Sequence, residues 1–237
     1  MSRLAMLSVA SVFFLASCGA QQQEVGEMQH KSRSIQPQDA KSVRAHLVMG
    51  SGELNLSGGA DALMEGDFSY NVSEWKPEVN YEVKGDRGEL SVEQGKGGKG
   101  VRPGGDARNE WDVSLNDGVP TDLRVEMGAG RSDLNLDDLT LTGLDLQMGA
   151  GETRVDLSGD YDRDFDATIQ GGVGEATIML PSKVGVRAKA EGGLGEINTR
   201  GLTKEGNAYV NDAYQDADVT LEVDVEGGVG EINLKVV

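Results

Sequence analysis

The chain has 237 residues, enough for one large or two small domains; only 38% are apolar and 5% aromatic, and 34 are glycines. Its formal net charge of −18 repels nucleic-acid phosphates, which argues against a nucleic-acid partner. With one cysteine and two histidines, the chain cannot form an internal disulfide and is undersupplied for a histidine zinc site or a histidine-based triad.

Residues 1–17 have the features of an export signal. The uncharged run Leu4–Leu15 is too short to span a bilayer, and it ends in Leu15-Ala16-Ser17-Cys18. This tetrapeptide resembles the lipobox of bacterial lipoprotein precursors. The resemblance implies cleavage before Cys18, lipidation of Cys18 with palmitate-type acyl chains, and membrane anchoring through that lipid. The alternative is an ordinary signal peptide with a chance cysteine.

The sequence after the cysteine predicts where the protein resides. Residues 18–42 are polar and are expected to be a lipidated, flexible tether between the membrane and the domain. Gly19, where Asp is absent, is similar to the outer-membrane sorting pattern of lipoproteins in hosts with two membranes. We therefore expect a secreted protein, lipid-anchored to the cell membrane, or to the outer membrane of such a host, with its domain facing the periplasm or the exterior.

The remainder, residues 43–237, contains an internal repeat built as strand, Gly-x-Gly, polar residue, strand. Its second glycine falls at positions 52, 130, 151, 174, 195 and 230, so a coil of about 21 residues recurs in the second half. The last copy carries an insertion at 200–218, which we interpret as a polar protruding loop. The spacings between residues 43 and 123 are longer, which indicates irregular first coils.

The side-chain pattern within each copy predicts the fold. Apolar residues alternate with polar ones, as in a strand with one buried face, and the alternation changes phase at each Gly-x-Gly, as in Ile169 followed by Ala176 and Ile178. An extra residue at a glycine corner explains the change. The sequence therefore predicts an all-β, single-domain β-solenoid, β-helix-like, with Gly-x-Gly corners. The alternative is a conventional sandwich of meandering strands.

These repeats, together with the segments 65–77, 108–111 and 117–120, resemble the bacterial toast-rack domain family over about residues 43–235. The resemblance implies β-strands stacked like slices in a rack, and a setting in the cell envelope. The family is similar to the domain of cell-wall-active antibiotic response proteins and to adhesin β-repeat domains. It is a domain of unknown function and implies no catalytic residues.

Several candidate sites have a simpler structural interpretation. The basic, glycine-rich stretch 95–106 lacks a phosphate-loop pattern and is expected to be a solvated loop. Glu175, Glu196 and Glu231 would stack one rung apart, about 4.8 Å, either as exposed glutamates or around a divalent cation. A recurring asparagine position favours a hydrogen-bonded ladder over a glycan-binding face; its members are Asn55, Asn135, Asn198 and Asn233.

We expect no enzyme, no metal site and no cofactor, since no nucleophile motif or metal motif is present. The leading hypothesis is a non-catalytic, adhesin-like or envelope-stress-associated module that binds a cell-wall glycan or an envelope protein. The alternatives are a polysaccharide-modifying β-helix enzyme with paired carboxylates, and a passive spacer. The oligomeric state is left open by the sequence.

Overall fold

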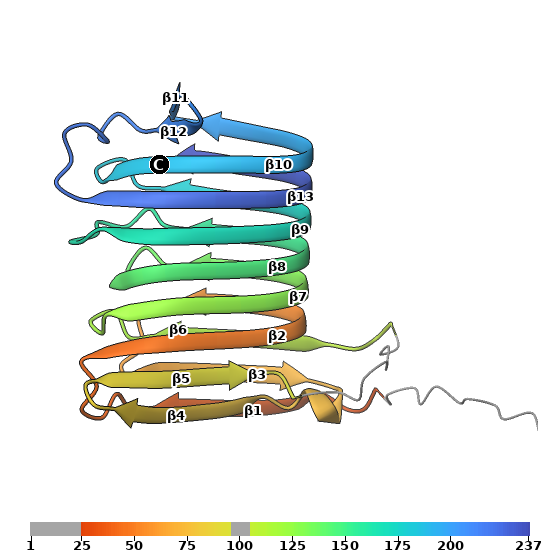
Figure 1. Cartoon of the computed structure of the whole chain (residues 1–237). Helices are drawn as coiled ribbons and strands as arrows, with labels where there is room; N and C mark the ends of the chain where they lie inside the picture. Colours follow the sequence, from red (N-terminus) through yellow and green to blue (C-terminus); the bar gives the residue numbers. More distant parts are fainter. Residues whose placement is uncertain (1–24, 96–104) are drawn as a thin grey trace, which may run out of the picture.

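The computed structural model describes residues 25–95 and 105–237 as an all-β protein, which confirms the expected fold class. Its strands belong to one sheet that folds back on itself as a stack of bent ribbons (Figure 1). Within the described residues, no element is a helix long and apolar enough to cross a bilayer. The elements are β1 (Gln29–Ile35), β2 (Ser42–Ser57), β3 (Met64–Tyr70), the 3-10 helix η1 (Ser73–Trp75), β4 (Glu78–Lys84), β5 (Arg87–Glu93), β6 (Asn109–Leu115), β7 (Thr121–Asn135), β8 (Leu141–Asp156), β9 (Phe165–Leu180), β10 (Gly185–Arg200), β11 (Thr203–Glu205), β12 (Ala208–Val210) and β13 (Thr220–Val236).

Six long strands form the body of the solenoid. Each bends at its Gly-x-Gly and so contributes two limbs to one coil, and neighbouring coils pair in parallel and in register. The order in space is β2-β7-β8-β9-β13-β10 (Figure 1). The solenoid is therefore confirmed, but the last strand, β13, lies between β9 and β10 rather than after them.

Both glycines of the corner are required by the close approach of successive coils. Gly174 has φ of +142°, which L side chains rarely adopt, and a Cβ there would overlap the carbonyl oxygen of Gly151. A Cβ on Gly172 would similarly overlap the carbonyl oxygen of Gly149. The bend can thus stack at the spacing of a β-sheet only where no side chain intervenes.

The core lies between the two limbs of each coil. Aliphatic side chains of equivalent positions form columns along the stack, as in Leu146, Ile169 and Val225 on the first limb. Ile178 and Leu234 form a column on the second limb, and both are fully buried. The change of phase at the corner keeps both limbs apolar on the inside, as the alternation predicted.

The N-terminal end is closed by hairpins instead of further coils. Strand β5 pairs with the first limb of β2 and carries β4, whereas β6 pairs with its second limb and carries β3 and β1. Trp111 is fully buried against Phe68, with ring centroids 5.4 Å apart in an edge-to-face arrangement. Trp75 packs with Tyr70 in a second, smaller cluster, so both tryptophans lie at this end.

Strand β1 changes the expected boundary of the domain. It lies within residues 18–42, expected to be a flexible tether, yet all seven of its residues pair antiparallel with β3. Its side chains are mostly exposed, so backbone pairing, rather than burial, holds it in place. The folded part therefore begins ahead of residue 43.

The C-terminal end is capped over one limb. The insertion at 200–218, expected to be a protruding loop, instead forms the hairpin β11–β12, and β12 pairs with the first limb of β10. Ala208 and Val210 are buried there. Asn211 fixes the cap, because its Oδ1 accepts from the Val186 amide at 2.9 Å and its Nδ2 donates to the carbonyls of Pro181 and Val184 at 3.0 and 2.8 Å. Within the described residues, no strand pairs with the outer edge of the second limb of β10.

Candidate functional site

The inside of the bend changes composition along the stack. Two positions of each coil face each other there. One directly precedes the Gly-x-Gly, and the other lies five residues after it in the chain. The former is Met49, Met127 or Met148 in β2, β7 and β8, but glycine in β9, β13 and β10. The methionines are buried and fill the bend. Beyond Met148 the bend therefore lacks its filling side chain.

The facing residue compensates for this loss in two of the three later coils. In β13 the Cδ1 atom of Ile232 would lie 3.0 Å from a Cβ placed on Gly227, so the isoleucine occupies the vacated space. In β9 the facing residue is only Ala176, and a Cβ on Gly171 would meet nothing nearer than a backbone oxygen at 3.9 Å. One coil thus pairs a glycine with an alanine and leaves a void.

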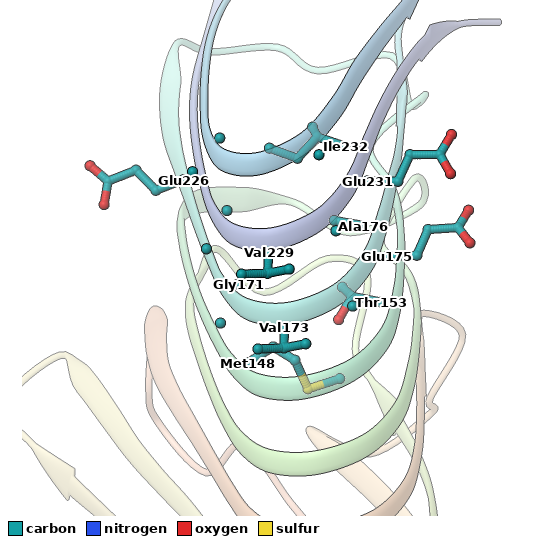
Figure 2. A pocket seen from close by; sticks show the side chains of 18 of the residues that line it. Met148, Thr153, Gly171, Val173, Glu175, Ala176, Glu226, Val229, Glu231 and Ile232 are labelled. Carbon is teal, nitrogen blue, oxygen red and sulfur yellow. The ribbon is translucent and has the colours of Figure 1, made fainter.

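This void belongs to a largely apolar cavity of about 40 Å³ at the bend of β9, β13 and β10. Buried Met148, Ile169, Val225 and Ile232 form its inner wall. Figure 2 shows Thr153, Ala176 and Ile232 on successive coils along one limb, with Met148 below. Among the described residues, none that lines this cavity is aromatic.

The rim of the cavity carries an exposed aliphatic ridge. Val173, Val229 and Leu194 are the middle residues of Gly-x-Gly in β9, β13 and β10, and they are 57%, 47% and 72% exposed. They follow each other along the stack, as Figure 2 shows for the two valines. The same column in β2, β7 and β8 holds serine and alanine. Adjacent exposed aliphatics over a cavity are typical of a binding surface.

Acidic side chains flank the ridge on one limb. Glu175, Glu231 and Glu196 form one column, and Figure 2 shows the first two pointing away from the stack. Glu231 accepts a hydrogen bond from Asn198 at 2.6 Å, and Glu175 accepts one from Asn233 at 3.2 Å. The equivalent residues of the two preceding coils instead form an Arg131–Glu152 ion pair of 2.9 Å.

The other limb has the same asymmetry. Glu226 and Glu191 continue the column of Glu126, and none of the five acidic side chains flanking the ridge forms an ion pair with any described residue. Glu126 differs because His46 and Arg124 contact it at 3.1 and 2.8 Å. Burial raises the pKa of Glu126, but these hydrogen bonds outweigh that effect and hold the pKa below its ordinary value. The acidic charge is thus neutralised at Glu126 and Glu152 in the early coils and not beside the ridge.

The expected column of Glu175, Glu196 and Glu231 exists, but Glu231 lies in the middle because β13 is inserted. Among the described residues, no group of three or more His, Cys, Asp or Glu is placed to hold a metal ion. The asparagine ladder is reduced to Asn198 and Asn233, which hydrogen-bond at 3.2 Å. Two other members lie apart: Asn55 donates to Asp112, and Asn135 lies in a different column.

Two further predictions, for Cys18 and for the glycine-rich stretch, fall on residues outside the described part. Cys18, the predicted lipidation site, lies outside the described residues, as does most of the glycine-rich stretch 95–106. The segment 160–164 is dense in acidic residues and lies within the described part, where Asp160 pairs with Lys183 at 2.9 Å and Asp162 with Arg163 at 2.8 Å. Both pairs are at the surface, and each carboxylate has a basic neighbour.

Sequence reasoning missed the cavity, although a signal was present. The repeat begins Met-Gly-x-Gly in its early copies and Gly-Gly-x-Gly in those centred on Gly174, Gly195 and Gly230. The replacement of methionine by glycine could have indicated a loss of filling at the corner. That Ala176 fails to replace the missing volume follows only from knowing which residue faces Gly171.

Comparisons with known proteins agree with this architecture. Residues 24–179 match the family described as the N-terminal domain of toast_rack, DUF2154. The crystal structure of a provisionally named cell adhesion protein from Clostridium sporogenes is 39% identical, with a TM-score of 0.87, over 89% of this chain and 100% of that one. A provisionally named adhesin from Bacteroides fragilis matches over 90% of this chain and 99% of its own, at 9% identity and a TM-score of 0.29, too low to carry an argument. The search of curated proteins found no match.

Proposed function

Because the chain belongs to the family of the N-terminal domain of toast_rack, we propose that it is a non-catalytic, adhesin-like binding module of the cell envelope. The provisional name of the Clostridium sporogenes relative, cell adhesion protein, supports this proposal. The observation that carries it is the aliphatic ridge of Val173, Val229 and Leu194 over an apolar cavity. A rigid, preformed surface of this kind avoids ordering costs on binding.

The proposal includes lipid anchoring at Cys18 after cleavage of residues 1–17. The mature N-terminus then leads through a short polar segment to β1, and the stack begins there. The bend of β9, β13 and β10 lies several coils further along, at the other end of the stack (Figure 1). An anchor at one end of the stack therefore leaves this bend near the opposite end (Figure 1). We propose that the partner is an envelope protein, or alternatively a cell-wall glycan.

Two experiments test these proposals separately. Anchoring predicts that cells fed an alkyne analogue of palmitate label the wild-type chain and not Cys18→Ser, and that only the wild type sediments with membranes. For binding, the domain without its lipid is sedimented with isolated sacculi and with an envelope protein fraction, and new reducing ends are assayed. Binding without product supports the module. Release of reducing ends would favour a polysaccharide-modifying enzyme. The absence of both binding and released reducing ends would favour a passive spacer.

A further inference from the structure

The cavity, the ridge and the acidic column of Glu175, Glu231 and Glu196 lie on the same three coils, β9, β13 and β10, and the second flank, Glu226 and Glu191, lies on the last two. Resting on the proposed binding function, we propose that this bend captures a cationic segment of a partner protein, with one branched aliphatic side chain of that segment inserted into the cavity. Lysine or arginine residues on both sides of the inserted residue meet the acidic flanks. The three features are three parts of one recognition site.

The size of the cavity selects the anchoring side chain. A water molecule needs about 10–15 Å³, whereas a cavity that binds benzene measures about 150 Å³. The 40 Å³ at this bend therefore fits the end of a leucine, isoleucine or valine side chain and excludes an indole ring. In its inner wall, apolar atoms of Met148, Ile169 and Ile232 offer an aliphatic group dispersion contacts.

The charge of the flanks selects the residues beside the anchor. Glu175, Glu231 and Glu196 follow each other at the rung spacing of about 4.8 Å, and like charges at this distance in water repel by about 0.9 kcal/mol per pair. Cations of a partner relieve this repulsion on binding. Glu226 and Glu191 offer the same attraction across the ridge, so cations are favoured on both sides.

The early coils show that this combination is not a general property of the corner. There the ridge position holds Ser51, Ala129 and Ala150, the bend is filled by methionine, and Arg131 neutralises Glu152. The ridge residue, the filling of the bend and the loss of the ion pair all change at β9, whereas the acidic flank on the other limb begins one coil later, because β9 carries Gln170 there. A solvated corner needs none of these changes, whereas a site for an apolar anchor between cations needs all of them.

The probes are four labelled peptides of identical length with Gly-Ser ends. Their centres are Lys-Lys-Leu-Lys-Lys, the same with serine in place of leucine, the same with tryptophan in place of leucine, and Ser-Ser-Leu-Ser-Ser. Fluorescence anisotropy is measured with the domain at low salt and again at about 0.5 M salt. We expect the leucine–lysine peptide to bind at least tenfold more tightly than the other three. Its binding should also weaken with salt, because exposed charges are screened.

The decisive variant is Ala176→Ile, which fills the cavity without touching a charge or the ridge. It should weaken binding of the leucine–lysine peptide at least tenfold while the domain stays folded. The matched control is Ile178→Val, two residues further along β9, which is buried outside the cavity lining and should bind as the wild type does. Glu231→Gln should weaken binding and reduce its salt dependence.

Equal binding of the leucine and serine peptides, or unchanged binding to Ala176→Ile, would overturn the cavity as the anchor and leave simple charge attraction. Absence of binding by all four peptides would overturn the inference altogether. The proposed function is tested by different readouts, sedimentation with envelope fractions and lipid labelling at Cys18. If the domain sediments with an envelope fraction but binds no peptide, only the nature of the partner is refuted.

Discussion

The void beside Ala176 predicts that Ala176→Ile makes the protein more stable. Neighbouring coils carry isoleucine at the equivalent positions, Ile232 and Ile197, so the substitution continues a column that already exists. Isoleucine adds three carbons to alanine, worth about 2.4 kcal/mol at about 0.8 kcal/mol per buried carbon. Fixing the side chain costs about 0.5–1 kcal/mol. The expected net gain in the free energy of unfolding is about 1.5 kcal/mol.

Thermal unfolding followed by circular dichroism measures this gain. For a domain of this size, 1 kcal/mol raises Tm by about 2–4 °C, so Ala176→Ile should raise it by about 3–6 °C. The control is Thr153→Ile, one coil away, where Met148 already fills the bend and the Thr153 hydroxyl accepts a hydrogen bond from Ser132 at 3.1 Å. Overpacking should cost that variant about 1–3 kcal/mol. If both substitutions destabilise the protein equally, the reasoning about the void is wrong.

Three further predictions concern the glycine corner, the C-terminal cap and the paired carboxylate of Glu126. Gly172→Ala should lower the free energy of unfolding in urea by about 2 kcal/mol or more, because its Cβ overlaps the Gly149 carbonyl. Asn211→Ala removes three hydrogen bonds of about 1 kcal/mol each, so it should lower Tm and speed proteolysis of 201–219; an unchanged cleavage rate would contradict its role in the cap. Glu126 has a lowered pKa in the folded state, so its contribution to stability is present above about pH 4.3 and is lost as pH falls below that value. Glu126→Gln should therefore flatten the acid limb of the stability curve between about pH 5 and 3, and identical limbs would refute this assignment.

Much of the fold follows from the sequence because its cause is local. The change of phase at each corner fixes which face of each limb is buried, and a slip of one residue would expose the whole core. The requirement for glycine at the corner has an equally local cause, since the overlap at Gly174 involves only the neighbouring coil, β8. These features therefore appear in every copy and could be predicted without knowing how the copies are arranged.

The order of the last two coils could not be predicted in this way. The copies containing Glu196 and Glu231 share the sequence Gly-Glu-Ile-Asn, so both fit equally well next to β9. Strand β1 was missed for a related reason, because Gln29–Ile35 lacks an alternating apolar face and is held by backbone pairing with β3. The alternation of apolar and polar residues predicts which side chains are buried. It predicts neither the order of strands in the sheet nor an edge strand whose side chains are exposed.

The inserted strand also determines how the candidate site is assembled. Strand β13 supplies Glu226, Val229, Glu231 and Ile232, and it is framed by β9 on one side and β10 on the other. Without β13, Ile197 of β10 would lie next to Ala176, and the acidic column would contain two residues instead of three. The binding surface is therefore complete only when the C-terminal strand occupies its slot. In the chain, the insertion at 200–218 with the hairpin β11–β12 lies between β10 and β13, so the segment that caps β10 is also the connection that leads back to this slot.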